Sequence, residues 1–176
     1  MLARLATPLH AALLVLFGSL ATIGGAWFIE LVLDVKPCHL CLIGRIPHYL
    51  GIAVGVFAVW VNLPSRPKWL GRSALALLAA VFLVGTGIAA YHSGVEFGIF
   101  AGPSDCTGTL EKPVAIQDFL KQLQTVKVIR CDEVAMRIFG LSLASWNAII
   151  SLGLAGVAGL GATRANTEWR PFRARH

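Results

Sequence analysis

Two cysteines separated by two residues are the most chemically reactive feature of the chain, in the segment PCHLCLIGR at positions 37–45. A C-x-x-C pair closes a small ring that is typical of thiol–disulfide exchange. At the start of a helix, the macrodipole also favours the thiolate form of one of the two thiols. A thiolate can attack a disulfide or donate electrons, so Cys38 and Cys41 predict a redox site where a helix begins.

Arg45 lies four residues after Cys41, one helical turn further along, at the edge of an apolar run. An arginine at that depth is costly unless it forms an ion pair, reaches water or has a function. Within one turn of a thiolate, its positive charge would stabilise the thiolate and attract a carbonyl oxygen of an electron acceptor. The alternative is an interfacial arginine whose long side chain only reaches the membrane surface.

Cys106 and Cys131 bring the cysteines to four, which allows three disulfide pairings. The simplest pairing joins Cys38 to Cys41 and Cys106 to Cys131. Two alternatives stay open: all four sulfur atoms could bind one metal ion, or both disulfides could be purely structural. A metal site would normally have a second closely spaced pair, whereas 24 residues separate Cys106 from Cys131.

The elements that must position these residues are membrane helices, because 56% of the 176 residues are hydrophobic and only 14% are charged. A bilayer core needs about 20 apolar residues of helix, and the first apolar stretch is too long for a signal peptide. Spans are expected at about 11–33, 43–63, 72–92 and 141–163. We therefore expect an all-α fold, with one four-helix membrane bundle over residues 1–163 and a basic tail at 164–176.

Lysine and arginine are distributed unevenly over the expected loops. The N-terminus, the loop between the second and third spans and the tail hold eight basic residues against one acid, Glu168, whereas the remainder holds seven against eight acids. By the positive-inside rule, both termini are cytoplasmic and all four cysteines lie on the opposite side of the membrane. The net charge of +6 is thus a topology signal, and no nucleic-acid partner is expected.

Two loops on the far side of the membrane are expected to carry the cysteines, a short one at 34–42 and a long one at 93–140. Disulfides persist outside the cytosol, so this segregation favours two bridges. Within the long loop, apolar residues recur with helical spacing and predict a short amphipathic helix on the membrane surface. These residues are Ile116, Phe119, Leu120 and Leu123.

Glycines within the expected spans predict close packing between helices. The segment GTGIAA at 85–90 matches a dinucleotide-binding fingerprint, but that motif needs a preceding strand and here lies inside an apolar span. We interpret it as a close helix contact. The same interpretation applies to Gly24, Gly25, Gly153, Gly156 and Gly159.

Four segments resemble the DsbB family, the disulfide-bond formation proteins of the bacterial inner membrane. They are PCHLC followed by Arg45, AAYHSGVEFG at the end of the third span, GPSDCTG in the long loop, and CDEVAMRIFGLSLASWN leading into the fourth span. The resemblance covers nearly the whole chain from the first span to the fourth. It implies an enzyme, a disulfide oxidoreductase, with the long loop and its cysteines in the periplasm.

The resemblance implies a relay through both cysteine pairs. A periplasmic DsbA-like protein of the thioredoxin fold would attack the Cys106–Cys131 disulfide, with the mixed disulfide formed at Cys106. Thiol exchange would pass the electrons to Cys38 and Cys41, and then to a quinone of the lipid bilayer, ubiquinone or menaquinone. Cys41 is the cysteine that would face the quinone.

The resemblance also implies a quinone-binding role for Arg45 and for His92, at the outer end of the third span. His48, about one turn after Arg45, is expected on the same face. No metal ligand is expected in this relay. Two other functions remain open: a membrane protein that binds or transports metal through its cysteines, and a DsbB-like enzyme dedicated to one substrate.

Overall fold

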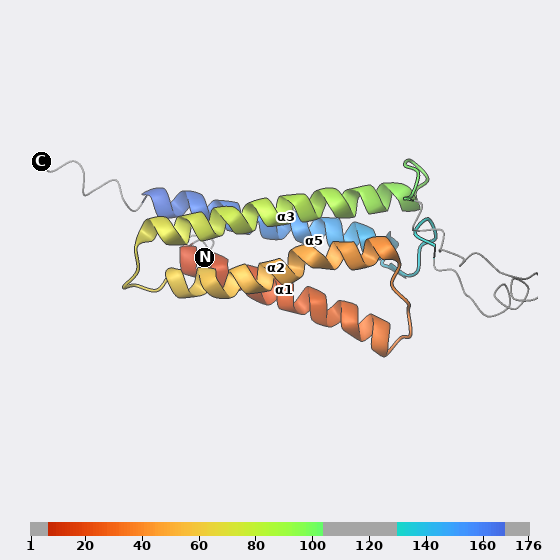
Figure 1. Cartoon of the computed structure of the whole chain (residues 1–176), viewed down its shortest axis with the longest axis horizontal. Coiled ribbons are helices and arrows are strands. Elements are labelled where there is room, and N and C mark those ends of the chain that lie inside the picture. The colour runs from red at the N-terminus through yellow and green to blue at the C-terminus, as the bar shows by residue number, and fades with distance from the viewer. Residues whose placement is uncertain (1–6, 104–129, 168–176) are drawn as a thin grey trace, which may run out of the picture.

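The computed structural model describes residues 7–103 and 130–167 of the chain. Its long helices are α1 (Pro8–Leu31), α2 (His39–Val61), α3 (Lys68–Glu96) and α5 (Leu143–Thr167), which run side by side in a bundle (Figure 1). Each of the four is long and apolar enough to cross a membrane. The expected four-helix membrane bundle is confirmed, and the chain is a multi-pass membrane protein.

The helices form a ring in which α1 and α3 lie diagonally opposite each other. α3 packs mainly against α5 and α2, and α1 packs against α2 and α5. α1 begins and α5 ends at the end of the bundle where α2 joins α3, and α1 diverges from α2 toward the other end (Figure 1). That other end carries the beginning of α2, the end of α3 and the beginning of α5, and it is where the site lies.

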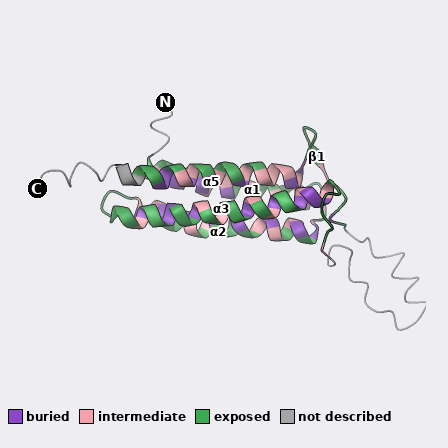
Figure 2. Cartoon of the chain, turned by 90° about the horizontal axis from the view of Figure 1, so that it is seen from above, coloured by how far each residue is buried: buried purple, intermediate pink, exposed green. Residues whose placement is uncertain are grey.

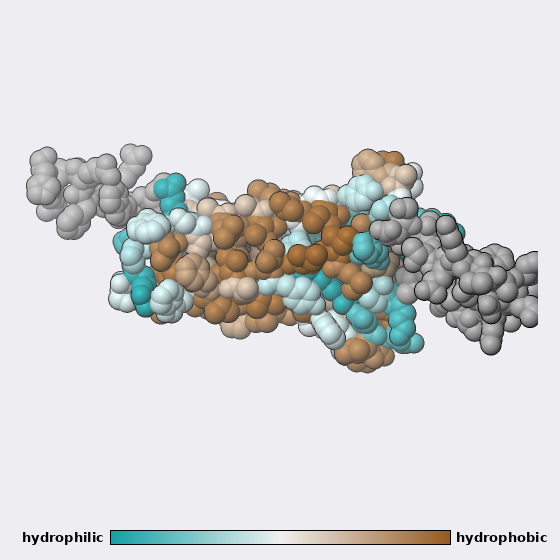
Figure 3. All heavy atoms as spheres, viewed as in Figure 1, coloured by the Kyte–Doolittle hydropathy of each residue, from teal (hydrophilic) through white to brown (hydrophobic). Residues whose placement is uncertain are grey.

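The core of the bundle is small and the outside is apolar, as expected for a protein surrounded by lipid. Phe82, Leu75 and Leu78 of α3 are fully buried, together with Val15 of α1 and Val61 of α2. Each helix also exposes much of its surface (Figure 2), and the middle of the visible face is mostly hydrophobic (Figure 3). Hydrophobic side chains that would be unfavourable in water therefore face the membrane interior.

Two helix ends differ from the expected spans and shape the site. α2 begins at His39 instead of about residue 43, because the Cys38 sulfur caps its first turn by accepting a hydrogen bond from the Cys41 backbone N–H at 3.3 Å. α3 continues to Glu96, and Gly98, two residues later, has a φ of +71°, which suits a glycine that terminates a helix. Hydrogen bonds from Ile99 N–H to Gly94 C=O (2.8 Å) and from Gly98 N–H to Val95 C=O (3.0 Å) complete this C-cap.

The start of the expected fourth span is a small antiparallel hairpin instead of helix. Strand β1 (Arg137–Ile138) pairs with β2 (Leu141–Ser142) around a turn in which Phe139 and Gly140 have positive φ. Positive φ at both residues of a two-residue loop is the backbone conformation that joins two hairpin strands tightly. α5 starts immediately afterwards, at Leu143, and runs past the expected end to Thr167. The predicted amphipathic helix at 116–123 and residues 168–176 of the predicted tail lie outside the described residues.

Close packing at glycine is confirmed at one predicted position and wrong at others. A Cβ atom on Gly85 would lie 2.9 Å from Cβ of Pro47, so α3 approaches α2 at that point. Gly87 of the same segment has no neighbouring atom within 4 Å of an added Cβ among the residues described, and Gly25 faces a cavity. The other predicted glycines likewise have no neighbouring atom within 4 Å among the residues described. These are Gly24, Gly25, Gly153, Gly156 and Gly159.

Replacing Gly85 with alanine should loosen the contact between α2 and α3, because the rigid Pro47 ring leaves no room for a methyl group. We expect Gly85→Ala to lower the free energy of unfolding by about 1–3 kcal/mol. Gly87→Ala, two residues along the same helix with no atom within 4 Å, is the matched control and should be neutral or slightly stabilising. Thermal unfolding in detergent measures both, and equal effects would contradict the contact.

Candidate active site

The C-x-x-C pair forms the first turn of α2 and is present as two free thiols. The Cys38 and Cys41 sulfur atoms are 2.9 Å apart and share a hydrogen bond. Cys38 is buried, with 7% of its surface exposed, and Cys41 is half-buried. The disulfide expected between them is therefore open here, and the structure shows the dithiol form of the pair.

Cys38 is the thiol whose ionisation the site favours. Its pKa is lowered to about 4, first because the Cys41 thiol hydrogen-bonds to its sulfur. Burial opposes this shift, while His92 and the backbone N–H of Cys41 add to it. The sequence predicted one activated thiol at a helix start, and the capping position of Cys38 explains why it is the first of the two.

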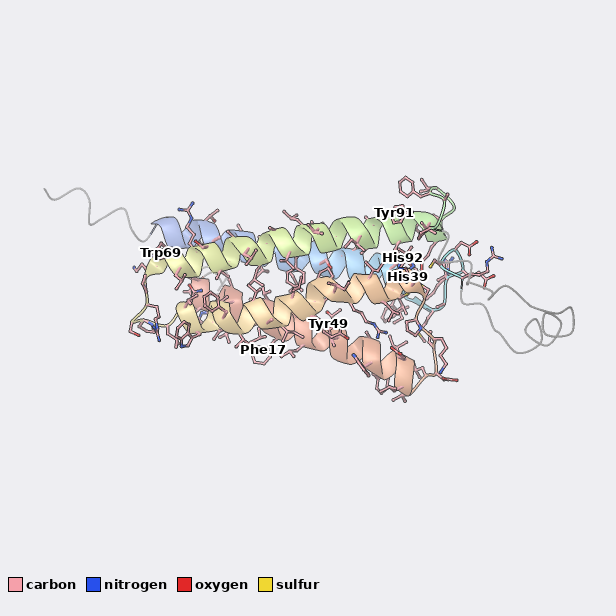
Figure 4. The ribbon with its side chains drawn as sticks, in the orientation of Figure 1. Phe17, His39, Tyr49, Trp69, Tyr91 and His92 are labelled. Atoms are coloured by element: carbon pink, nitrogen blue, oxygen red, sulfur yellow. The ribbon has the colours of Figure 1, made fainter. Side chains whose placement is uncertain are left out.

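His92 and Glu96 approach the cysteines from the last turns of α3. His92 Nε2 lies 3.6 Å from Cys38 Sγ and 3.9 Å from Glu96 Oε1. The side chain of Glu96 is 6% exposed, and its other oxygen, Oε2, is buried with no hydrogen-bond partner among the described residues. Figure 4 shows His92 and His39, which lies between the two cysteines, at the same end of the bundle.

Arg45, one turn after Cys41, forms an ion pair with Glu30 near the end of α1. Arg45 Nη1 and Glu30 Oε2 are 2.6 Å apart, with side-chain exposures of 14% and 28%. One donor of the guanidinium is thus used by the carboxylate, and other donors remain for a ligand. The ion pair offsets part of the free-energy cost of placing a charged arginine at this depth in the membrane.

A cavity of about 460 Å³ lies beside the cysteine pair, between α1, α2, α5 and the hairpin. Most of its wall is apolar, which suits a hydrophobic ligand. Cys41 lines it, whereas Cys38 does not. Its other polar side chains include Arg45, His48, His92 and Asn147.

His48 is held deeper in the bundle by Asn147 of α5. His48 Nε2 is 2.8 Å from Asn147 Oδ1, and Asn147 Nδ2 donates to the Gly44 carbonyl at 3.4 Å. This arrangement places the Nε2 proton toward Asn147 and leaves Nδ1 as a buried acceptor with no hydrogen-bond partner in the described part of the chain. The three predicted side chains, Arg45, His48 and His92, therefore meet at one cavity.

Cys131 is disulfide-bonded and packs beside the first cysteine pair. It is 1% exposed and belongs to the same apolar cluster as Cys38, Leu40 and Val95. A cysteine in a disulfide is not a thiolate ligand, so the structure does not show a site of four thiolates. Cys106 lies outside the described residues.

Comparison with known proteins identifies the family of the chain. The family model "Disulfide bond formation protein DsbB" matches residues 8–161. The chain belongs to the DsbB family. Disulfide bond formation protein B 1 of Pseudomonas syringae pv. syringae (strain B728a) is 32% identical, over 76% of this chain and 78% of that protein. Disulfide bond formation protein B of Stutzerimonas stutzeri (strain A1501) is 25% identical, over 86% and 93%. No solved structure matches the chain significantly.

Three partners in this DsbB-family site were not predicted as site residues. Glu30 could have been found as the acid that ends an otherwise charge-free stretch, on the same side of the membrane as Arg45. Asn147 is an amide within an apolar span, which usually indicates a contact between helices. Glu96 follows His92 by four residues and so shares its helix face, but its burial depends on the C-cap at Gly98.

The low pKa of Cys38 predicts a thiolate above about pH 4 and a thiol below it. We expect the ultraviolet thiolate absorbance of the reduced DsbB-family protein to fall with a midpoint near pH 4, measured in a Cys106→Ala/Cys131→Ala background. Cys38→Ser should lose this transition, and His92→Ala should move it to higher pH. A midpoint near the ordinary thiol value of 9.0 would contradict the assignment.

The ion pair between Arg45 and Glu30 predicts coupling between two helices. In a double-mutant cycle of Arg45→Gln and Glu30→Gln, each single variant leaves a half-buried charge unpaired. We expect the double variant to be more stable than the sum of the single effects predicts, by about 0.5–3 kcal/mol. Chemical unfolding in detergent measures the coupling, and strictly additive effects would show that the contact contributes nothing.

Proposed function

We propose that this DsbB-family protein is a thiol:quinone oxidoreductase of the bacterial inner membrane. It would reoxidise a periplasmic DsbA-like dithiol carrier through its two cysteine pairs and pass the electrons to ubiquinone or menaquinone. The observation that carries the proposal is the position of Cys41, which touches the Cys38 sulfur and lines an apolar cavity that Arg45 also lines.

The entry of electrons is thiol–disulfide exchange, in which each step breaks one S–S bond and forms another. The carrier thiolate would attack the disulfide of Cys131, and the family resemblance places this attack at Cys106. The Cys131 thiolate that is released would attack the Cys38–Cys41 disulfide. The carrier's second thiolate would then resolve the mixed disulfide with Cys106, and the Cys106 thiolate so released would resolve the disulfide between Cys131 and the C-x-x-C pair. These four attacks leave the carrier oxidised, Cys106–Cys131 restored and the C-x-x-C pair as a dithiol. The burial of Cys131 beside Cys38 supports this order, because it places Cys131 next to the first pair.

The exit of electrons takes place at the cavity. A quinone bound there would accept two electrons and two protons. The Cys38 thiolate and the Cys41 thiol release two electrons and one proton when their S–S bond forms, so the second proton would come from another donor or from water. Cys41 presents its sulfur to the cavity and would pass the electron pair to the quinone as the Cys38 thiolate, 2.9 Å behind it, closes the S–S bond. The Arg45 cation stabilises negative charge on an acceptor oxygen. His92 lines the cavity and lies 3.6 Å from Cys38, where it can hold a proton.

The charge distribution supports the orientation. Arg66, Lys68 and Arg72 lie near the connection between α2 and α3, at the end of the bundle opposite the cysteines. The positive-inside rule makes that end cytoplasmic, together with both termini. The cysteine end then faces the periplasm, where a soluble carrier can reach it.

Quinone reduction by the purified protein tests the proposal, with a reduced DsbA-like carrier as the electron donor. We expect turnover by the wild-type protein and none by Cys41→Ser. Arg45→Ala should raise the KM for quinone about tenfold or more with a smaller change in kcat, because its charge acts on the acceptor. His39→Ala, an exposed residue between the cysteines, is the control and should behave as wild type.

Two outcomes would contradict the proposal. Absence of turnover with both ubiquinone and menaquinone analogues would remove the quinone step. Full activity of Cys41→Ser would show that electrons leave by another route. Arg45→Lys, which retains the charge but not the planar donor geometry, separates a charge effect from loss of packing.

A further inference from the structure

We infer that the dithiol form of this site binds a soft divalent cation, with Zn²⁺ as the representative ion, through Cys38, Cys41, His92 and Glu96. The ligand atoms of the first three residues lie within 4.8 Å of one another. Two thiolates and an imidazole are ligands that Zn²⁺ prefers. The inference concerns the reduced protein alone and does not depend on what the electron acceptor is.

The distances fit tetrahedral coordination after a small movement. Bond lengths of about 2.3 Å to sulfur and 2.0–2.1 Å to nitrogen place two sulfurs roughly 3.8 Å apart and a sulfur and a nitrogen roughly 3.5 Å apart. Cys38 Sγ and His92 Nε2 are already 3.6 Å apart. The two sulfur atoms, at 2.9 Å, must separate by roughly 0.9 Å. Rotation of the half-buried Cys41 side chain can provide that separation.

Glu96 supplies a second, independent indication of a cation. Its side chain is only 6% exposed, and Oε2 has no hydrogen-bond partner in the described residues. Burying a carboxylate without a partner is costly. Oε1 lies 3.9 Å from His92 Nε2, but Glu96 is not among the residues whose ligand atoms all lie within 4.8 Å of one another, so its carboxylate must move toward the sulfur atoms to bind the same cation. Glu96 would then be the fourth ligand and would balance the cation charge together with the two thiolates.

Metal binding and the disulfide exclude each other, because the same sulfur electron pairs form either bond. Cys131 is held in its own disulfide, so a histidine and a carboxylate complete this site instead of the second cysteine pair. The site therefore exists only while Cys38 and Cys41 are reduced. A bound cation would hold the protein in that state.

Zn²⁺ titration of the full-length protein in detergent tests the inference, in a Cys106→Ala/Cys131→Ala background that leaves only the two site thiols. A phosphine reduces the protein, and competition with a chromophoric chelator gives the affinity. Co²⁺ in place of Zn²⁺ reports thiolate ligation through its charge-transfer absorption. We expect one ion per chain in the reduced protein and none after oxidation of Cys38 and Cys41.

The variants separate this site from simple chelation by a dithiol. We expect Cys41→Ser to abolish uptake, and His92→Ala and Glu96→Gln each to weaken it about 10–100-fold. His39→Ala, with an exposed imidazole next to the same cysteines, should bind as the background protein does. Thermal unfolding checks that each variant is folded. If His92→Ala does not fold, the Co²⁺ spectrum of Glu96→Gln, compared with that of the background protein, tests whether side chains from α3 take part in binding.

Three results would overturn the inference: no uptake by the reduced protein, unchanged affinity in both His92→Ala and Glu96→Gln, or equal losses in His39→Ala and His92→Ala. The titration contains no quinone and no carrier. Its failure would therefore leave the proposed oxidoreductase activity untouched, and failure of quinone reduction would leave the metal site untouched.

Discussion

The contact between the Cys38 sulfur and the first turn of α2 is the interaction on which the site depends. By accepting the backbone N–H of Cys41, the sulfur starts the helix at His39 and fixes both thiols at the membrane end of α2. Cys41 is thereby turned toward the cavity, and Arg45 follows it one turn later on the same wall. The same contact adds to the lowering of the Cys38 pKa, of which the hydrogen bond from the Cys41 thiol is the largest cause.

Several polar groups in this bundle are tolerated because they are paired with a group on another helix. Glu30 of α1 pairs with Arg45 of α2, and Asn147 of α5 holds His48. The contact of Asn147 with α2 needs a close approach of α5, and Gly44 allows it, since a Cβ atom there would lie 2.9 Å from Asn147 Nδ2. Two buried side-chain atoms have no hydrogen-bond partner among the described residues, His48 Nδ1 and Glu96 Oε2. An unmatched carboxylate beside two thiols and a histidine is what a cation site would look like when it is empty.

The fold could be predicted from the sequence because apolar length alone determines how many helices cross a membrane. Arg45 and Cys41 could be placed on one face because they lie on one helix. The contacts of Glu30 and Asn147 could not, because they depend on how separate helices are rotated against each other. The glycine predictions failed at Gly153 for the same reason, since small size does not show which face a residue occupies. The helix ends at His39 and Glu96 were missed because a sulfur cap and a glycine C-cap extend the helices past the apolar stretches.

A single-turnover experiment tests directly whether electrons leave the Cys38–Cys41 pair for a quinone. The Cys106→Ala/Cys131→Ala protein is reduced, freed of reductant and mixed with quinone under anaerobic conditions, and both thiols and quinone are counted. One quinone should be reduced for every two thiols lost, and Cys41→Ser should lose no thiol and reduce no quinone. Persistence of both thiols beside unreduced quinone, in a protein shown to be folded, would contradict this electron transfer.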